Sequence, residues 1–564
     1  MKLDSNIKKG ILLLNMVVVV HLISQQVYKR FDLTQDQRYT VSQEAKSIIA
    51  PIDAPLIIEV LLDGNLPSEF KKLQRETKQL LEEFSTYNKN ISYSFSSPLE
   101  NQESTEQTQK QLYQMGMVAT EVELRDNGKV SLERLYPWAL AYYNGKTVKI
   151  PLLKNTLGAT SQERITNSIQ NLEYAFANAF KQLLTPKTKS IAFIKGNGEL
   201  EDTKIASFLK TIRGYYGIAP FILDSVANNP EGTLSQLLSF DLIVIAKPTE
   251  AFTEPEKYVL DQYIMNGGAS LWLIDATVQK TDPDTGKSYL VGRDLGLNDL
   301  FFKYGARIQP TIVRDLYSAP IVLAQGTEND SKYKRYPWFY YPLSSSASGH
   351  PIVTNIEGVK FEYPSPITLL ENTVKKTILL SSSPVSAVAI TPHEINFDTA
   401  IPANLKTVNQ GPNPQEFSAG ELPLAILLEG RFTSALKNRV KPFKISDKSI
   451  ARDQSLETKM VIVSDGDIIT NQFDKSRPLP TGFDKMTQTM FGNNDFLLNA
   501  VDYLLDDTGL INIRTKKISI PFLDPQKVQE TRILWQGAHL VLPLIALGVF
   551  GLLFAFLRKK KYQH

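Results

Sequence analysis

An apolar segment near the C-terminus limits what this chain can fold into more than any other feature. Residues 537–557 read GAHLVLPLIALGVFGLLFAFL and contain no Asp, Glu, Lys or Arg. A helix of this length crosses the apolar core of a bilayer, which is about 30 Å thick. Trp535 is placed as an interfacial anchor, and the basic run 558–561 predicts that this end faces the cytoplasm. We therefore predict a transmembrane helix rather than a buried core helix.

A second apolar segment, residues 10–23, lies near the N-terminus. It is short, contains Asn15 and His21, and has lysines on both sides, so its flanks do not decide its orientation. No small-residue cleavage pattern follows it at residues 22–27, which argues against a removable signal peptide. We predict an uncleaved anchor. Two spans would place both termini in the cytoplasm and the bulk of the chain outside the inner membrane.

The C-terminal span contains small residues that would let another helix approach closely. A polar side chain inside lipid is costly, but His21 and His539 both lie near span ends, which favours interfacial placement over a function. The predicted helix-packing positions are Gly537, Ala538, Ala546, Gly548 and Gly551.

Composition narrows the classes of function. The chain has no cysteine, which excludes disulfides, thiolate metal sites and cysteine nucleophiles. Its formal net charge is +3, so no general nucleic-acid surface is indicated. With 564 residues it is too long for a single hydrophobic core, so several domains are expected.

The chain between the two spans divides by pattern. A capping box of Thr160 and Glu163 begins a strongly amphipathic helix that ends near residue 184. The boundaries that we predict are an N-terminal anchor over 1–30, an N-terminal α/β domain over 31–155, a linking helix over 156–188, a central α/β domain over 189–475 with a Pro- and aromatic-rich insertion over 277–423, a C-terminal helix and extended segment over 476–530, a transmembrane helix over 533–557 and a basic tail over 558–564.

The central domain alternates between strand and helix signals. Buried-strand patterns occur at residues 190–194, 241–246, 270–274 and 459–464, and helical patterns separate the first three. This alternation predicts an α/β fold with a doubly wound, mostly parallel sheet.

The turn Gly196-Asn197-Gly198 follows the first of these strands and resembles the start of a phosphate-binding loop. A dinucleotide fingerprint needs a third glycine, but Glu201 stands there and Glu199 adds negative charge. A turn at the end of a strand is therefore favoured. Ligands of open α/β sheets bind at this end of the strands, so Asn197 and Glu199 stay candidate contacts.

Other chemical motifs are incomplete. Residues 145–147 and 286–288 imitate a Walker A loop, but Leu140 and Thr281 stand where its first glycine is needed. No zinc-protease helix and no serine-hydrolase elbow is present in the sequence. We expect no catalytic residue, no metal, no cofactor and no ATP hydrolysis by this chain.

Two further groups are candidate contacts. Asp465 and Asp467 follow the strand at 459–464, but the oxygen ligands of a calcium loop do not continue after them, which favours a strand-end turn. Tyr336, Trp338 and Tyr340 lie in the densest aromatic run and could stack on a sugar or a peptide, or plug a buried loop.

Several motifs in order resemble the GldG family of gliding-motility-associated ABC transporter components. They are FDLT and RYTVS at residues 31–34 and 38–42, LLDGNLP at 61–67, and Gly196 to Glu199, where Asn197 replaces the family's histidine. The resemblance spans nearly the whole chain, including both apolar segments. It implies an auxiliary, substrate-binding-like subunit that works with a separate ATPase and a permease. It also implies a central sheet similar to class I glutamine amidotransferases, whose cysteine nucleophile is missing here.

Three hypotheses follow. The first is a non-enzymatic periplasmic subunit of an ABC-type complex in the bacterial inner membrane, linked to gliding and secretion, whose partners are a permease, an ATP-binding subunit and the lipid bilayer. The second is a periplasmic glycan- or peptide-binding scaffold that contacts its ligand through Trp338. The third is a degenerate enzyme with a polar site above residues 196–199, together with Asp465 and Asp467.

Overall fold

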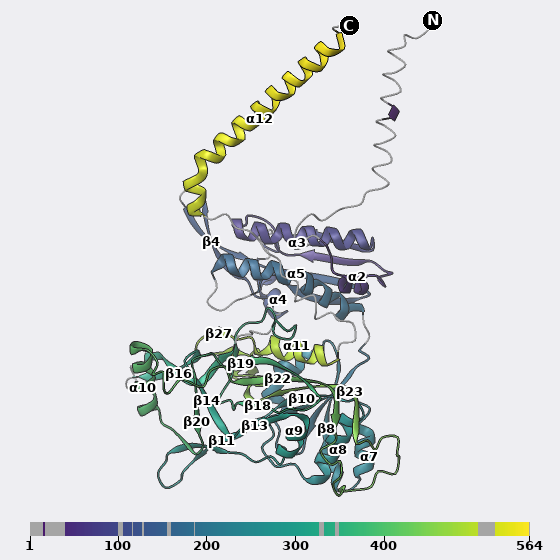
Figure 1. Ribbon diagram of the computed structural model, residues 1–564, viewed down its shortest axis with the longest axis vertical. Coiled ribbons are helices and arrows are strands. Elements are labelled where there is room, and N and C mark those ends of the chain that lie inside the picture. The colour runs from purple at the N-terminus through teal and green to yellow at the C-terminus, as the bar shows by residue number, and fades with distance from the viewer. Residues whose placement is uncertain are drawn as a thin grey trace. The chain divides into compact units, whose positions relative to one another are not determined.

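The computed structural model describes residues 15–16, 40–99, 105–115, 117–126, 129–154, 160–184, 187–325, 332–344, 349–505 and 525–562. The chain forms two compact units that divide between Lys517 and Ile518, and each is described here by itself. Apart from Asn15 and Met16, the predicted N-terminal anchor lies outside the described residues. The first unit is a mixed α/β structure with several sheets (Figure 1).

The N-terminal part of the first unit is built on a four-stranded sheet of order β2-β1-β5-β6. Phe84 of one helix packs edge-on against Phe180 of another, with ring centroids 5.3 Å apart. The capping box is confirmed, because Thr160 N–H donates to Glu163 Oε2 at 2.8 Å and Glu163 N–H donates to Thr160 Oγ1 at 3.3 Å. The elements are α2 (Gln43–Ile49), β1 (Leu56–Val60), α3 (Ser68–Tyr87), β2 (Ile91–Phe95), α4 (Thr105–Gln114), the hairpin β3 (Thr120–Asp126) and β4 (Lys129–Leu135), β5 (Trp138–Tyr143), β6 (Lys146–Pro151) and α5 (Ser161–Leu184).

The central sheet has seven strands in the order β19-β22-β23-β10-β9-β7-β8. The five strands from β8 to β23 are parallel, and the last two, β22 and β19, are antiparallel to their neighbours. The sheet is therefore mostly parallel, as the sequence predicts. Its strands are β7 (Ser190–Lys195), β8 (Gly217–Ile222), β9 (Leu242–Ala246), β10 (Ala269–Leu273), β19 (Lys375–Ser381), β22 (Pro423–Thr433) and β23 (Gln454–Val463).

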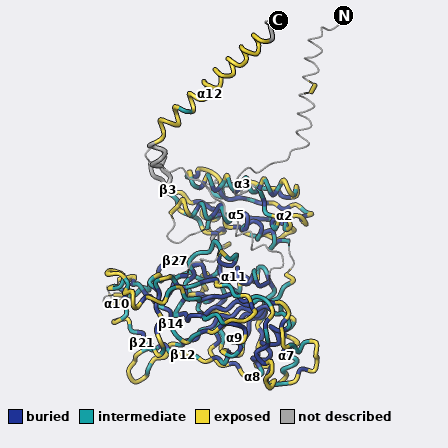
Figure 2. Tube along the Cα trace, viewed as in Figure 1, coloured by how far each residue is buried: buried dark blue, intermediate teal, exposed yellow. Residues whose placement is uncertain are grey.

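Apolar side chains pack on both faces of this sheet, because successive residues of a strand point to opposite faces. In β10, Leu271 and Leu273 join one buried cluster and Trp272 joins the other. Figure 2 shows the strands as the most buried part of the molecule. One cluster includes α7 (Pro230–Leu237), α8 (Glu254–Met265) and α9 (Asn298–Tyr304), and the other includes α6 (Ala206–Ile212) and α11 (Asn493–Leu505). The likeness to class I glutamine amidotransferases stays a prediction.

The segment between β10 and β22 forms small antiparallel sheets, and its strand β19 joins the edge of the central sheet. Short 3₁₀-helical turns elsewhere in the described residues are η2 (Asp202–Ile205), η3 (Leu223–Ala227) and η4 (Asp467–Ile469). The other elements of the segment are β11 (Thr277–Thr281), β12 (Ser288–Gly292), β13 (Ala306–Ile308), β14 (Thr311–Asp315), β15 (Ser318–Gln325), β16 (Lys332–Ser344), β17 (Val359–Lys360), β18 (Ile367–Leu369), β20 (Ser386–Ile390), β21 (His393–Ile395) and α10 (Phe397–Gln410). After β23 come four short strands, namely β24 (Phe473–Asp474), β25 (Arg477–Pro478), β26 (Phe483–Asp484) and β27 (Thr489–Met490).

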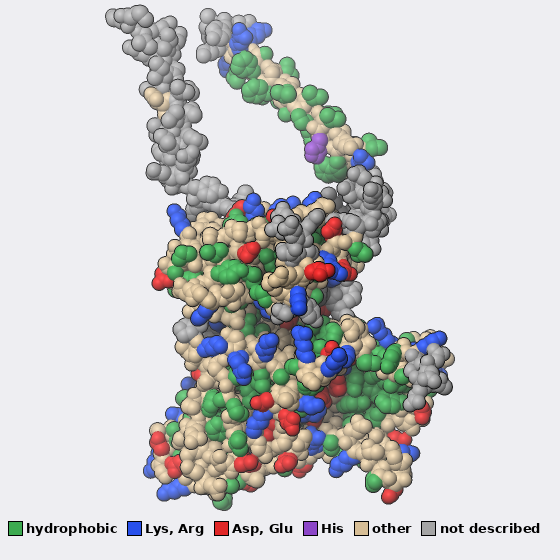
Figure 3. All heavy atoms as spheres, turned by 180° about the vertical axis from the view of Figure 1, so that it is seen from behind, with side chains coloured by type: hydrophobic (Ala, Val, Ile, Leu, Met, Phe, Trp, Pro, Cys, Tyr) green, Lys and Arg blue, Asp and Glu red, His purple; other side chains and the backbone are tan. Residues whose placement is uncertain are grey.

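The second unit contains one long helix, α12 (Pro525–Tyr562). Its stretch Thr531–Lys560 has a mean hydropathy of 2.7 in its most apolar window, none of which is buried, and it is long enough to cross a membrane. It is the one such helix among the residues that the structure describes. Figure 3 shows its hydrophobic side chains along the helix, with a histidine and basic residues among them. A helix with this much exposed apolar surface suggests a membrane anchor.

Candidate functional site

The carboxyl ends of the parallel strands carry most of the candidate residues. Counted along the chain, the five parallel strands have the order 2-1-3-4-5, and this order reverses between β7 and β9. In open α/β sheets, ligands bind at such a reversal, beside the carboxyl ends of the strands. Asn197 and Glu199 follow β7, and Asp465 and Asp467 follow β23, so all four predicted residues lie at this edge.

Backbone hydrogen bonds close the gap between the loops that follow β7 and β9. The carbonyl oxygen of Asn197 accepts from the N–H groups of Thr249 and Glu250 at 2.9 and 3.0 Å. The hydroxyl of Thr249 donates to the carbonyl oxygen of Gly198 at 3.0 Å. Gly198 has a φ of +69°, and a Cβ there would overlap the Thr249 hydroxyl, so the close approach needs glycine. The protein's own loops therefore fill the position where a ligand would enter.

The side chain of Asn197 stabilises this turn. It is 3% exposed, and its Nδ2 donates to Glu256 Oε2 at 3.2 Å. The same carboxylate oxygen accepts from Thr253 N–H at 2.7 Å and caps α8. Asn197 N–H donates to Glu199 Oε2 at 2.9 Å, and burial raises the pKa of Glu199. Asn197 thus joins the turn after β7 to the start of α8, as a structural turn residue does.

A charged cluster lies at the ends of β9, β10 and β23. The ammonium nitrogen of Lys247 lies 3.3 Å from Asp275 Oδ2 and 2.5 Å from Asp467 Oδ1. Asp275 Oδ1 accepts from Gly466 N–H at 2.6 Å. Asp465 is fully buried and accepts from the N–H groups of Asp467 and Glu362 at 2.7 and 2.6 Å. The cluster therefore fastens three strand ends and the chain after β17 to one another.

The electrostatics of the cluster follow from burial and crowding. Burial raises the pKa of Asp275 and of Asp465, and the negative charge of Asp467 raises both further. Burial lowers the pKa of Lys247, but the carboxylates of Asp275 and Asp467 outweigh burial and hold it above its usual value. Lys247 is therefore protonated at neutral pH and supplies the counter-charge that the buried carboxylates require.

The three carboxylates also have the spacing of a cation site. Ligand atoms of Asp275, Asp465 and Asp467 all lie within 4.8 Å of one another. The ammonium of Lys247 lies against two of these residues, where a bound cation would otherwise lie. We therefore assign no metal to this cluster and interpret it as a structural site in which Lys247 partly offsets the negative charge.

Sequence reasoning missed Lys247 and Asp275. Lys247 directly follows the fully buried strand β9. Asp275 is the second residue after the fully buried strand β10. The signal was available, since the carboxyl ends of parallel strands lie at the same edge and charged residues there come together. Lys247 also has a φ of +55°, which no sequence pattern predicted.

The aromatic candidates lie elsewhere, in β16, and are buried. Tyr336, Trp338 and Tyr340 are 5%, 0% and 4% exposed. Trp338 packs on Tyr340 with ring centroids 5.0 Å apart, and Tyr340 Oη lies 2.7 Å from Nε2 of His393. These side chains offer no aromatic face to a sugar or a peptide. The ligand-stacking interpretation is therefore corrected: all three side chains are buried, and Trp338 and Tyr340 belong to a small hydrophobic core.

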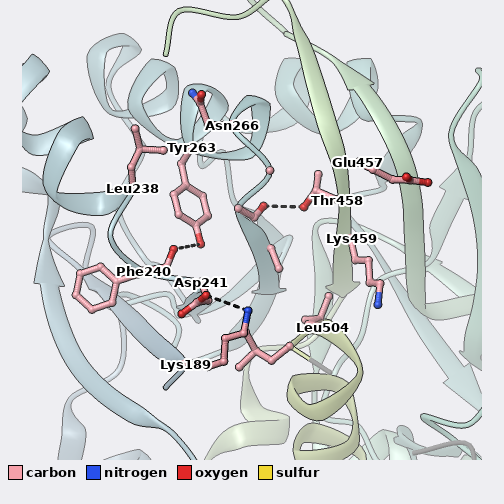
Figure 4. A pocket seen from close by; sticks show the side chains of 14 residues that line it. Lys189, Leu238, Phe240, Asp241, Tyr263, Asn266, Glu457, Thr458, Lys459 and Leu504 are labelled. Carbon is pink, nitrogen blue, oxygen red and sulfur yellow. Dashed lines mark hydrogen bonds and ion pairs between the residues drawn. The ribbon is translucent and has the colours of Figure 1, made fainter. Parts of the chain in front are cut away.

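A polar pocket of about 330 Å³ lies at the opposite, amino edge of the central sheet (Figure 4). Lys189 forms an ion pair with Asp241 at 3.3 Å, and Tyr263 Oη donates to the carbonyl oxygen of Phe240 at 3.1 Å. Leu504, near the end of α11, lines the same pocket. Other polar side chains of the lining bond to the backbone: Thr458 Oγ1 donates to the carbonyl oxygen of Gly268, and Lys459 Nζ donates to that of Tyr503. Sequence reasoning indicated no site here.

Comparison with known proteins shows the family to which the chain belongs. Residues 188–500, which include both edges of the central sheet, match the model of a family described as an ABC-type uncharacterized transport system. The chain belongs to this ABC transport auxiliary family. The family indicates an auxiliary component of an ABC-type transport system, and its matched region contains the cluster of Lys247, Asp275, Asp465 and Asp467.

Three other comparisons say less about the function of the chain. Residues 35–142 match a domain of unknown function. An uncharacterized protein of Borreliella burgdorferi is 22% identical over 98% of this chain and 98% of its own length. Among solved structures, the mmIFT52 N-terminal domain covers 57% of this chain and 99% of that chain, at 15% identity and a TM-score of 0.31, which is too low to support any inference.

Proposed function

We propose that this protein is a non-enzymatic, membrane-anchored subunit that works with a separate ATPase and a permease in an ABC-type complex. The observation that carries the proposal is a combination: one chain contains the auxiliary family domain at residues 188–500 and the exposed apolar helix α12. The basic residues 558–561 would hold the end of α12 in the cytoplasm, with the α/β unit in the periplasm.

The carboxyl edge of the central sheet supports a non-enzymatic role. The loops after β7 and β9 bind each other directly, and Lys247 forms ion pairs with two carboxylates of the cluster. Asn197 Oδ1 and Glu199 Oε1 have no hydrogen-bond partner at this edge, but both atoms are buried and so are not presented to a substrate. The sequence also has no cysteine, so the nucleophile of glutamine amidotransferases has no counterpart.

The proposed mechanism is mechanical. ATP-driven motion of a permease would move α12 and the N-terminal apolar segment, and these would move the outer α/β unit, which holds a partner or cargo. The resemblance of the motifs at residues 31–42, 61–67 and 196–199 to the GldG family supports the further proposal of a link to gliding motility and secretion.

The experiment is recovery of partners from membranes in mild detergent, with a C-terminal tag and identification by mass spectrometry. We expect a permease and an ATP-binding subunit. The matched control replaces residues 533–557 with an unrelated apolar helix of equal length, which keeps an anchor but removes the surface of Gly537, Gly548 and Gly551. If the permease and ATPase are absent from the wild-type sample, the proposed function is wrong. If the control recovers the permease and the ATPase equally well, the α/β unit and not the helix makes the contact with them.

A further inference from the structure

A second pocket, of about 270 Å³, opens beside the carboxyl end of β10. Its floor is apolar and buried: Ile274 and Leu297 are 3% exposed and Phe301 is 2% exposed. Its rim is polar and includes the exposed residues Asp294 and Asn298. An apolar floor with a few polar groups at the rim is the usual composition of a small-molecule site.

Arg293 is the one basic residue among those that line this pocket. Its Nη1 donates to the carbonyl oxygen of Pro248 at 3.2 Å, and its backbone N–H donates to the carbonyl oxygen of Ala276 at 2.8 Å. The first bond holds the half-buried side chain, and the second fixes the backbone that carries it. Among the described residues, no carboxylate forms an ion pair with Arg293; the neighbouring Asp294 accepts from Gly296 N–H instead. The guanidinium therefore keeps donors for an anion.

We propose that this pocket binds a small organic acid with an apolar body. The carboxylate would pair with the guanidinium of Arg293, which offers two parallel N–H donors to such a group. The hydrocarbon part would cover Leu297 and Phe301 on the floor. The volume lies just below the usual range of ligand pockets, about 300–1,000 Å³, so the ligand is small.

The inference goes beyond the proposed function and does not depend on it. The pocket is formed by one chain, and all of its lining residues lie in the described range 187–325. Arg293 donates to the carbonyl oxygen of Pro248, the residue after Lys247, so the side chain that would bind the acid is joined to the loop that carries Lys247.

The test uses the purified full-length protein in detergent and titration calorimetry. The probes are hexanoate and phenylacetate, with hexanamide and phenylacetamide as neutral analogues of the same shape. We expect the two acids to bind at least tenfold more tightly than the amides, because only the acids form a charge-assisted bond. Equal affinity of acids and amides, or no binding by either, would overturn the proposal.

Three variants locate the site. Arg293→Gln should remove the preference for acids while keeping a donor near Pro248. Arg307→Gln, at an exposed position of the nearby strand β13, should leave binding unchanged. Ala276→Leu should weaken the binding of acids and amides alike by at least tenfold, because it fills the pocket, and the melting temperature of the unliganded variant checks its folding. Unchanged binding by Arg293→Gln or by folded Ala276→Leu would show that the site lies elsewhere.

The outcomes also separate this inference from the proposed function. Failure to bind acids leaves the recovery of a permease and an ATPase untouched. If no probe binds but Ala276→Leu loses the permease in the recovery experiment, the pocket receives a side chain of the partner, and the small-acid proposal is wrong.

Discussion

The ammonium nitrogen of Lys247 lies 3.3 Å from a carboxylate oxygen of Asp275, so one ion pair joins the ends of two neighbouring parallel strands. Lys247 makes a second ion pair with Asp467, beyond the next strand of the sheet. Three loops that are far apart in the sequence are thereby held by one cation. The consequences of removing it can be measured.

Lys247→Met should lower the free energy of unfolding at pH 7 by about 3–5 kcal/mol, because it leaves buried carboxylates without a counter-charge. Urea denaturation of the wild-type and variant proteins gives the difference. The control is Lys441→Met, which removes the exposed ion pair with Asp453 and should cost less than about 1 kcal/mol. Similar losses for the two variants would contradict a buried, tightly coupled cluster.

The loss caused by Lys247→Met should shrink as the pH falls from 8 to 5. A carboxyl whose pKa is raised by folding stabilises the native state below its ordinary pKa, and this contribution disappears as pH rises through the raised value. Burial already raises the pKa of Asp275 and Asp465, and removal of the cation should raise both further. Denaturation midpoints measured across this range would contradict the prediction if the difference between the two proteins stayed constant.

Gly198→Ala should destabilise the central domain more than Gly286→Ala. Both glycines have a positive φ, +69° and +67°, so both substitutions share the backbone strain. A Cβ at Gly198 would also overlap Thr249, whereas a Cβ at Gly286 meets no atom within 4 Å. We expect an extra loss of about 1–3 kcal/mol at Gly198, the usual cost of overpacking. Equal losses would mean that the contact between the loops after β7 and β9 is not tight.

Trp338→Ala should cost about 3–5 kcal/mol of stability, because it removes a large side chain from a closed core. Tyr333→Ala, also in β16, removes a side chain that is 70% exposed and serves as the control. Thermal melting distinguishes the two. A stable Trp338→Ala protein with reduced binding of a glycan or peptide would instead restore the ligand-stacking interpretation.

The proposed topology is open to single-cysteine labelling, because the natural chain has no cysteine. Lys303→Cys, exposed in α9, should react with a membrane-impermeant maleimide in cells whose outer membrane is permeabilised. Lys561→Cys should react only after the inner membrane is broken. The reverse pattern would invert the orientation.

The order of elements in the parallel sheet could be predicted because each buried strand is a short apolar run between turns. The strand expected at residues 241–246 is β9, Leu242–Ala246, and the helical pattern expected between it and the next strand is α8, Glu254–Met265. The antiparallel strand β22 was missed, since its run LAILL reads equally as strand or buried helix. Its assignment depends on pairing with β23 and β19, which no local pattern contains.

The candidate site was predictable only in part for the same reason. Residues next to conspicuous turns, such as Asn197 and Asp465, were identified. Lys247 and Asp275 lie in unremarkable sequence, and only the three-dimensional sheet brings them to Asp465 and Asp467. The burial of Trp338 likewise depends on α10 and β20, which pack around it from distant parts of the chain.

The pocket of Figure 4 has a consequence for how the central domain bears load. Lys189, just before the first strand, and Leu504, near the end of the last helix, line the same small pocket. The chain therefore enters and leaves the central domain at almost one point. A pull on the segments before and after the domain acts between Lys189 and Leu504, and not along the hydrogen bonds between the β-strands. Force passed through the chain ends would therefore load the contacts around Lys189 and Leu504 before the strands of the central sheet.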